Sequence, residues 1–216
     1  MNTISIENLK SGDCILCHGH NLLDCAIEVC SRSKFSHSAI ILKDPYYIDE
    51  QLKGIYILES SLEFNPDVED GKIHLGVQLQ PIEVLLNDYK YNDLLVRPLQ
   101  VEIPNINQKI LSAYKELKDK PYNLDPIDWL AAKILIDDSF RVEKQNWFKK
   151  CFGNTEQQTK SFWCSAMVAF FYVRLGVLDK DCSFAILAPE HFRKKHDKEM
   201  PWVSSGVLGE ETKLIA

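Results

Sequence analysis

Cys164 stands at the beginning of an apolar segment, residues 161–175, whose side chains are hydrophobic almost all around a helical wheel. This pattern predicts a buried helix with the cysteine in its first turn. The N–H groups at a helix N-terminus carry a partial positive charge, which stabilises a thiolate and lowers the pKa of a cysteine. The same groups can bind the oxyanion that develops on a substrate carbonyl. Cys164 is therefore the candidate nucleophile.

A nucleophilic cysteine needs a base within hydrogen-bonding reach, and the base needs a group that orients it. His37 opens an apolar strand, residues 38–42, and Glu59 follows the next one, residues 55–58. In an antiparallel hairpin the start of one strand lies beside the end of its partner. The topology alone thus predicts that His37, the candidate base, and Glu59, the candidate orienting group, are neighbours.

Each of these residues also has a purely structural interpretation. A cysteine in an apolar helix is usually a core residue, and a histidine at a strand edge usually lies at the surface or has its hydrogen bonds satisfied. His74, on a predicted half-buried strand, is a competing base for which no partner is evident. His191 and His196 belong to a basic run, residues 191–196, which predicts a solvated face.

The chain has seven cysteines, and this odd number without a secretory signal predicts reduced thiols rather than a disulfide framework. The string Cys-x-x-Cys-His at residues 14–18 matches c-type haem attachment, and with His20 it supplies four candidate zinc ligands. Structural zinc sites usually pair two ligand couples across a longer loop, which is missing here. We therefore expect no metal or cofactor, but a strand with two faces: Cys14, Leu16 and His18 on one, Ile15 and Cys17 on the other.

The hydrophobic pattern predicts an α+β fold in which a mostly antiparallel sheet packs against helices, one of them deeply buried. The whole chain, residues 1–216, is expected to be a single domain with a polar insert at 137–160. The expected strands are residues 13–17, 36–43, 54–60, 73–80 and 93–99. The expected helices are residues 21–30, 105–118, 127–136 and 161–175, the last closed by Gly176.

The composition is that of an ordinary globular protein, with 45% hydrophobic and 26% charged residues. The net charge of −6 argues against a protein that binds nucleic acid through bulk charge, so no nucleic-acid partner is expected. No apolar run is long enough to span a membrane, and the N-terminus lacks the features of a secretory signal. We expect a cytoplasmic protein, or one of the virion or host cytoplasm if it is viral.

Several short segments spread over nearly the whole chain resemble those of a known family in order and spacing. They are the Gly-Asp turn 9–13, the histidine strand 33–40, the strand 57–60 with the third polar member, the strand 95–99, the Pro-Tyr segment 120–123, the cysteine helix 162–168 and the turn 188–190. Together they resemble the circularly permuted papain-like hydrolases, specifically the bacterial YiiX/YaeF-type cysteine amidases and their relatives in large DNA viruses. These are kin of NlpC-type peptidases and of lecithin retinol acyltransferase.

The resemblance implies a permuted papain-like (NlpC-type) fold and a Cys-His-Glu triad, with the chain order of histidine, acid and cysteine. In that triad Cys164 attacks a carbonyl, His37 takes and returns the proton, and Glu59 fixes the imidazole. N–H groups near Cys164 hold the oxyanion. Weaker candidates for binding the substrate or oxyanion are Tyr122, Trp163 and Ser165.

Two departures from the family pattern bear on substrate choice: Ala166 replaces a frequent glutamate, and the insert at 137–160 is long. The leading interpretation is a cysteine-dependent hydrolase of amide or ester bonds. The first alternative is a lipid-directed acyltransferase or thiol lipase, whose aromatic and lysine-rich stretch 147–150 could touch a membrane surface. The second is a non-catalytic binding module that retains the fold. The choice among peptide, lipid and small-molecule substrates stays open, as does the oligomeric state.

Overall fold

The computed structural model describes residues 2–18, 34–62, 65–88, 94–123, 160–184 and 187–215. The predicted helices at 21–30 and 127–136, the 147–150 stretch and, apart from residue 160, the insert at 137–160 lie outside the described residues. No helix in the described part of the chain is long and apolar enough to cross a membrane.

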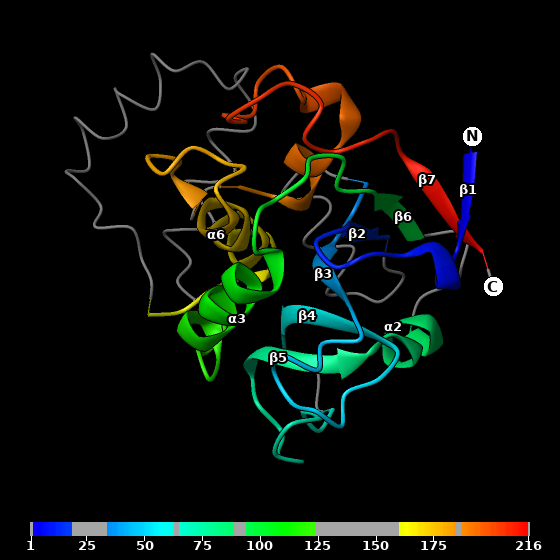
Figure 1. Cartoon of the computed structure of the whole chain (residues 1–216), viewed down its shortest axis with the longest axis vertical. Coiled ribbons are helices and arrows are strands. Elements are labelled where there is room, and N and C mark those ends of the chain that lie inside the picture. The colour runs from blue at the N-terminus through cyan, green and yellow to red at the C-terminus, as the bar shows by residue number, and fades with distance from the viewer. Residues whose placement is uncertain are drawn as a thin grey trace.

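A seven-stranded sheet with the order β1-β7-β6-β2-β3-β4-β5 forms the centre of the fold (Figure 1). Neighbouring strands are antiparallel except β1 and β7, which are parallel. The predicted mixed α+β class with a mostly antiparallel sheet is confirmed. The strands are β1 Asn2–Ser5, β2 Cys14–Cys17, β3 His37–Lys43, β4 Ile55–Ser61, β5 Gly76–Pro81, β6 Leu94–Arg97 and β7 Thr212–Ile215.

The five predicted strands correspond to β2 through β6. Most bounds agree within two residues, but β5 begins at Gly76 rather than at residue 73. Gly76 has a φ of 151°, and a Cβ there would lie 2.2 Å from the carbonyl oxygen of Lys120, so this close approach requires glycine. The approach brings residues 120–121 against the start of the edge strand, where Val77 N–H donates to the same carbonyl at 2.8 Å.

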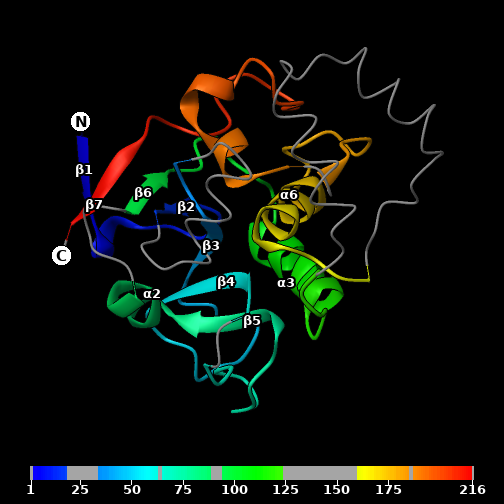
Figure 2. The ribbon, with the colours of Figure 1, turned by 180° about the vertical axis from the view of Figure 1, so that it is seen from behind.

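Helices α3 (Ile106–Leu117) and α6 (Cys164–Leu175) lie side by side against one face of the sheet in both ribbon views (Figures 1 and 2). The short helix α2 (Ile82–Asp88) packs on the opposite face through Ile82 and Leu85. Three short 3-10 helices complete the described elements: η1 Ile6–Asn8, η4 Pro189–Phe192 and η5 Lys194–His196.

Helix α6 is buried on nearly all sides, as its apolar sequence predicts. It starts at Cys164, three residues later than predicted, because Trp163 is extended (φ −85°, ψ 170°) and Phe162 forms a bridge with Tyr122. Gly176, in the left-handed conformation with a φ of 78°, closes the helix as predicted.

The two faces of the sheet bury separate hydrophobic clusters. Cys14 and Leu16 belong to the cluster beneath α3 and α6, whereas Ile15 and Cys17 belong to the cluster on the other face. This confirms the alternation predicted for the strand and directs the two thiols of the Cys-x-x-Cys string to opposite faces. Among the described residues, no group of three or more His, Cys, Asp or Glu could hold a metal ion, and His20 lies outside them.

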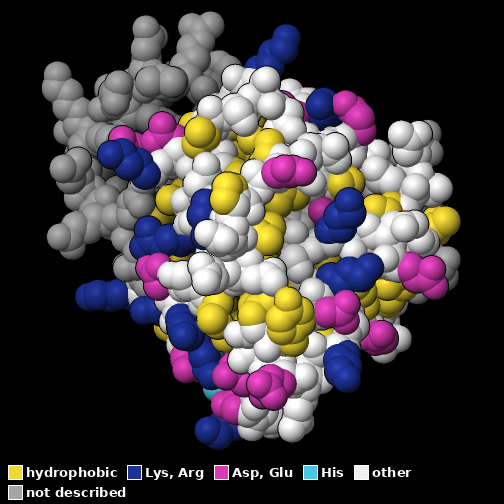
Figure 3. All heavy atoms as spheres, viewed as in Figure 1, with side chains coloured by type: hydrophobic (Ala, Val, Ile, Leu, Met, Phe, Trp, Pro, Cys, Tyr) yellow, Lys and Arg dark blue, Asp and Glu magenta, His cyan; other side chains and the backbone are white. Residues whose placement is uncertain are grey.

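The surface in Figure 3 carries basic and acidic side chains in a mixed arrangement, without a broad area of either sign on that face. A mixed surface of this kind is not one that attracts a polyanion through bulk charge. The absence of a nucleic-acid partner stays a prediction.

Arg97, at the end of β6, is fully buried and ties the sheet to the C-terminal segment. Its guanidinium donates to both carboxylate oxygens of Asp197 at 2.7 and 3.0 Å. It also donates to three backbone carbonyls, those of Phe192, Leu208 and Gly209, at 2.7–2.9 Å. A buried guanidinium with five hydrogen bonds is costly to remove because each acceptor is left unpaired.

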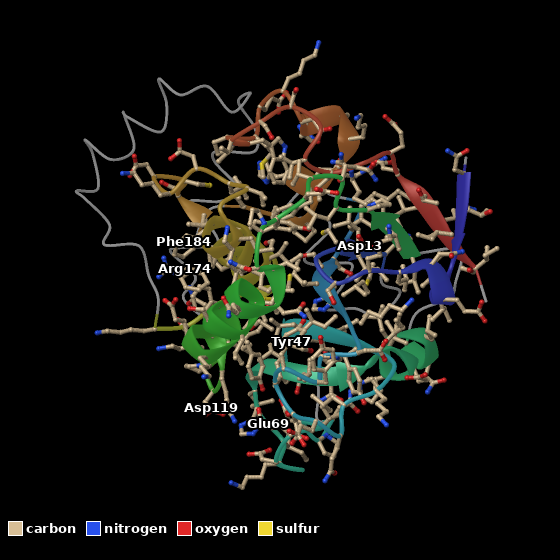
Figure 4. The ribbon with its side chains drawn as sticks, in the orientation of Figure 1. Asp13, Tyr47, Glu69, Asp119, Arg174 and Phe184 are labelled. Atoms are coloured by element: carbon tan, nitrogen blue, oxygen red, sulfur yellow. The ribbon has the colours of Figure 1, made fainter. Side chains whose placement is uncertain are left out.

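Arg97→Met is therefore expected to lower the free energy of unfolding by about 3–5 kcal/mol. The matched control is Arg174→Met. Arg174 lies on the outer side of α6 (Figure 4) and pairs with Glu116 of α3, with both side chains more than 40% exposed. Loss of such a surface pair should change the stability by about 1 kcal/mol or less. Urea unfolding followed by circular dichroism measures the free energy of unfolding of both variants. Equal losses of stability would contradict the conclusion that Arg97 ties the sheet to the C-terminal segment.

Candidate active site

Cys164 is the first residue of α6 and is buried, with 5% of its surface exposed. Phe162, the residue before the N-cap Trp163, fixes where this helix begins. The carbonyl of Phe162 accepts hydrogen bonds from the Ser60 hydroxyl at 2.6 Å and from the Asn123 N–H at 3.1 Å. The N–H of Phe162 donates to the carbonyl of Pro121 at 3.0 Å. These bonds anchor the chain directly ahead of the cysteine.

His37 and Glu59 are neighbours, as the hairpin topology predicts. The ladder of β3 and β4 is paired from Lys43 and Ile55 to Ile40 and Leu58, and the two residues lie just beyond this end. His37 Nε2 and Glu59 Oε2 are 2.6 Å apart, and both side chains are largely buried. Because Nε2 is engaged with the carboxylate, Nδ1 is the ring nitrogen left for another partner.

The thiol of Cys164 and the imidazole of His37 lie close enough to shift each other's pKa through a hydrogen bond and through their charges, so the structure brings the three predicted residues together. Cys164 Sγ also lies 3.9 Å from the carbonyl oxygen of Ser36, the residue before the histidine. Cysteine, imidazole and carboxylate thus form one chain of contacts across α6, β3 and β4. Such a chain has the arrangement of a nucleophile, a base and an orienting group.

The thiol and the imidazole shift each other's pKa in opposite directions. Burial is the largest influence on Cys164 and raises the pKa of its thiol, but the hydrogen bond with His37, the charge of His37 and the groups of Ser38 lower it below its ordinary 9.0. Burial lowers the pKa of His37, but hydrogen bonds with Cys164 and Glu59 and their negative charges raise it well above 6.5. Both directions favour a thiolate–imidazolium pair.

The weaker candidates divide into two kinds. Tyr122 lies near the sulfur: burial and the charge of Cys164 both raise the pKa of its phenol well above 10.0. The side chains of Trp163 and Ser165 instead donate to the carbonyl of Leu187, from Trp163 Nε1 at 3.1 Å and from the Ser165 hydroxyl. These two side chains anchor the start of α6, and their backbone N–H groups are the part that could face an oxyanion.

The segment that begins at Leu187 contacts both sides of the site. Besides the Leu187 carbonyl at the start of α6, it contains Glu190, a buried carboxylate in the turn 188–190. Glu190 Oε2 accepts a hydrogen bond of 3.3 Å from the N–H of Lys34, three residues before His37. One short segment therefore helps to hold both the cysteine helix and the histidine strand.

Gln78 contacts the candidate acid and was not predicted from the sequence. It lies on β5 directly opposite Glu59, and its Nε2 donates to Glu59 Oε1 at 3.2 Å. A pattern could have pointed to it: Gln78 and Gln80 alternate on a strand that is buried on both faces, where amide side chains need specific partners.

The other histidines lie in different surroundings. His74 pairs with Asp70 at 3.0 Å, in the irregular segment ahead of β5 rather than on a strand. The prediction that His191 faces solvent is wrong, because residues 189–196 form two short 3-10 helices instead of one amphipathic surface helix, and His191 is 5% exposed. Its Nδ1 accepts a hydrogen bond from the N–H of Ala188 at 2.9 Å. His196 is partly exposed and pairs with Glu199.

Comparisons with known proteins show a distant structural similarity. No family model and no curated protein matches the chain. Among solved structures, the chain is similar to a crystal structure of the metalloprotein YiiX from Escherichia coli O157:H7, DUF1105, with 16% sequence identity and a TM-score of 0.46. The alignment covers 95% of this chain and 88% of that one. The similarity concerns the chain trace and says nothing of the site.

We expect Cys164 to react with iodoacetamide at pH values below the ordinary thiol pKa of 9.0, because its thiolate is stabilised by His37. In His37→Ala the hydrogen bond and the charge that offset burial are lost, so the midpoint of the pH–rate profile should move upwards. Peptide mapping by mass spectrometry follows the rate at each cysteine. His74→Ala is the matched control, since His74 pairs with Asp70. Equal pH–rate profiles for His37→Ala and His74→Ala would contradict the assignment of His37 as the residue that stabilises the Cys164 thiolate.

Burial, the largest influence, lowers the pKa of His191 to about 4. At His191 the folded protein therefore binds fewer protons than the unfolded chain once the pH falls below 6.5, the ordinary value. The contribution of His191 to the free energy of unfolding should decline from there towards pH 4, by up to about 1.4 kcal/mol per pH unit. Urea unfolding at several pH values should show a shallower decline for His191→Gln, whereas His196→Gln should follow the wild type.

Proposed function

We propose that the protein is a cysteine-dependent hydrolase that cleaves an amide or ester bond through an acyl-thioenzyme intermediate. The observation that carries the proposal is the buried chain of contacts from Cys164 to His37 to Glu59, with the thiol at the N-terminus of α6. The order of these residues along the sequence agrees with the permuted papain-like family that the sequence resembles. Triads of this kind are defined by geometry and roles, not by chain order.

In the first half of the reaction, the Cys164 thiolate attacks the carbonyl carbon of the substrate and a C–S bond forms. The negative charge that moves to the carbonyl oxygen faces the N–H groups of the first turn of α6, which have no acceptor within the helix. Imidazolium His37 then gives its Nδ1 proton to the leaving amine or alcohol as the scissile bond breaks. Glu59 keeps Nε2–H bonded throughout, so the ring stays aimed at the sulfur.

In the second half, water attacks the thioester carbon and neutral His37 accepts a proton from it at Nδ1. The C–S bond then breaks, the carboxylic acid leaves, and the thiolate and imidazolium are restored. General acid–base catalysis by a positioned histidine typically contributes about 10²–10⁴-fold to the rate. An acyltransferase would differ only in the acceptor that replaces water. The stretch 147–150, which is interpreted from the sequence either as a membrane contact or as an ordinary amphipathic helix, lies outside the described residues.

We expect wild-type protein to hydrolyse p-nitrophenyl acetate and to show an acetyl adduct by intact mass, and Cys164→Ala to abolish both. Since His37 supplies the acid and base, His37→Ala should lower the rate by about 10²–10⁴-fold. Glu59→Gln should cause a smaller loss, because the imidazole remains but is held less well. Cys182→Ala, which removes another buried thiol, is the matched control and should keep the activity.

The same assay distinguishes the alternatives. Free acid as the product identifies a hydrolase, whereas transfer of the acyl group to an added amine or lysophospholipid identifies an acyltransferase. Hydrolysis that survives Cys164→Ala would refute the proposed nucleophile. A wild-type protein with neither adduct nor fast alkylation of Cys164 would instead favour the binding module.

A further inference from the structure

Glu59 is held through both of its carboxylate oxygens, each by a different strand. Oε2 lies 2.6 Å from His37 Nε2 on β3, and Oε1 accepts the hydrogen bond of 3.2 Å from Gln78 Nε2 on β5. Glu59 and Gln78 are directly opposite in the ladder of β4 and β5, and both are at most 2% exposed. The amide is thus the second group that determines how the carboxylate is turned.

A carboxylate with a single hydrogen bond can rotate about its last side-chain torsion, which is soft. A donor on the second oxygen fixes the plane of the carboxylate and hence the direction of its first oxygen. The donor also satisfies a buried oxygen that would otherwise lose its solvation without compensation. Gln78 provides both effects from a neighbouring strand of the sheet.

The orientation of the Gln78 amide leaves one of its buried polar atoms without a hydrogen bond, which packing alone does not explain. Gln78 Oε1 is buried and makes no hydrogen bond with any described residue. Turning the amide over would relieve nothing, because it would place Oε1 against the carboxylate oxygen of Glu59. The side chain therefore leaves its acceptor unsatisfied in order to donate to Glu59.

An amide is also a donor that carries no charge. Lysine or arginine at this position would neutralise Glu59 and weaken its attraction for the imidazolium of His37. A carboxyl group would compete with Glu59 for a proton. A neutral donor at residue 78 leaves Glu59 as the acidic partner of the imidazole.

We propose that Gln78 is a positioning residue of the proposed active site, acting through Glu59 on the orientation of the His37 ring. The proposal rests on the assignment of Cys164, His37 and Glu59 under the proposed function. It extends that chain of contacts by one member, to a fourth element of the fold, β5.

The chain itself offers a matched control two residues further along β5. Gln80 has the same side chain and the same 1% exposure as Gln78. Its Nε2 donates to the backbone carbonyls of Pro66 and Asn65, at 2.9 and 3.4 Å, so it anchors a loop. Replacing either glutamine by leucine removes one buried amide from the same strand, but only Gln78→Leu removes a contact with Glu59.

The experiment measures the pH–rate profile of Cys164 alkylation by iodoacetamide in full-length wild type, Gln78→Leu and Gln80→Leu. Loss of a hydrogen bond to a charged group corresponds to roughly a 10- to 100-fold change in an equilibrium or rate constant. Gln78→Leu should therefore slow alkylation at neutral pH by about tenfold or more and raise the midpoint of the profile. Gln80→Leu should lower the melting temperature without moving the midpoint.

A second variant gives a reversible readout within one sample. In Gln78→Glu, the new carboxyl group can donate to Glu59 Oε1 only while it is protonated. The ionisable groups near it are Glu59 on β4, His37 on β3 and Cys164 on α6. On its other side residue 78 lines a pocket with Asp67, Glu69, Asp70, His74, Tyr114, Lys118 and Asp119. The wild type shares all of these groups, so the ratio of the variant to the wild type isolates the new carboxyl group. Relative to wild type, alkylation should be preserved at acidic pH and lost as the pH rises. A purely structural role would produce no such pH-dependent ratio.

The possible failures are distinguishable. If wild-type Cys164 reacts no faster than the buried thiols of Cys14 and Cys182, the proposed function fails. If its fast reaction depends on His37 but Gln78→Leu has the same midpoint as Gln80→Leu, only the role of Gln78 is refuted. If Gln78→Leu does not fold, the comparison of Gln78→Glu with wild type decides. A ratio of their Cys164 alkylation rates that is constant across the pH range refutes the role of Gln78 equally.

Discussion

The backbone carbonyl of Phe162 determines where α6 begins, and the site depends on that position. Its two hydrogen bonds come from the Ser60 hydroxyl on β4 and from the N–H of Asn123. Residue 59, next to Ser60, engages His37. Strand β4 therefore fixes the start of the cysteine helix with one residue and the histidine ring with its neighbour. A shift of this strand would displace both partners together, which preserves their spacing.

Burial is what makes the arrangement electrostatically effective. The interior strengthens the attraction between a thiolate and an imidazolium, while each ion alone would pay a large desolvation penalty. The two ions are therefore stable there only as a pair, which is why the pKa values of Cys164 and His37 move in opposite directions. The same surroundings raise the pKa of Tyr122, so its hydroxyl stays protonated and keeps a hydrogen to donate.

The central hairpin and the pairing of His37 with Glu59 could be predicted because their patterns are local, whereas the joining of Cys164 to them is implied by the family resemblance. Alternation defined β3 and β4, and hairpin topology placed His37 next to Glu59. The remaining features depend on distant partners. Strands β1 and β7 are four residues each and become strands by pairing with each other across nearly the whole sequence. The contact of Gln78 with Glu59 needs the register of β5, and the burial of His191 follows from the path of the last segment over the sheet.

The place of β7 between β1 and β6 has a consequence for the order in which the chain can fold during synthesis. Translation proceeds from the N-terminus, and elements assemble as their partners emerge from the ribosome. Residues 2–5 have their sheet partner in residues 212–215, so β1 must wait until those residues have been made. The central strands and α6 can associate earlier. This edge of the sheet is thus closed after the central strands, through contacts of very large sequence separation, which are slow to form.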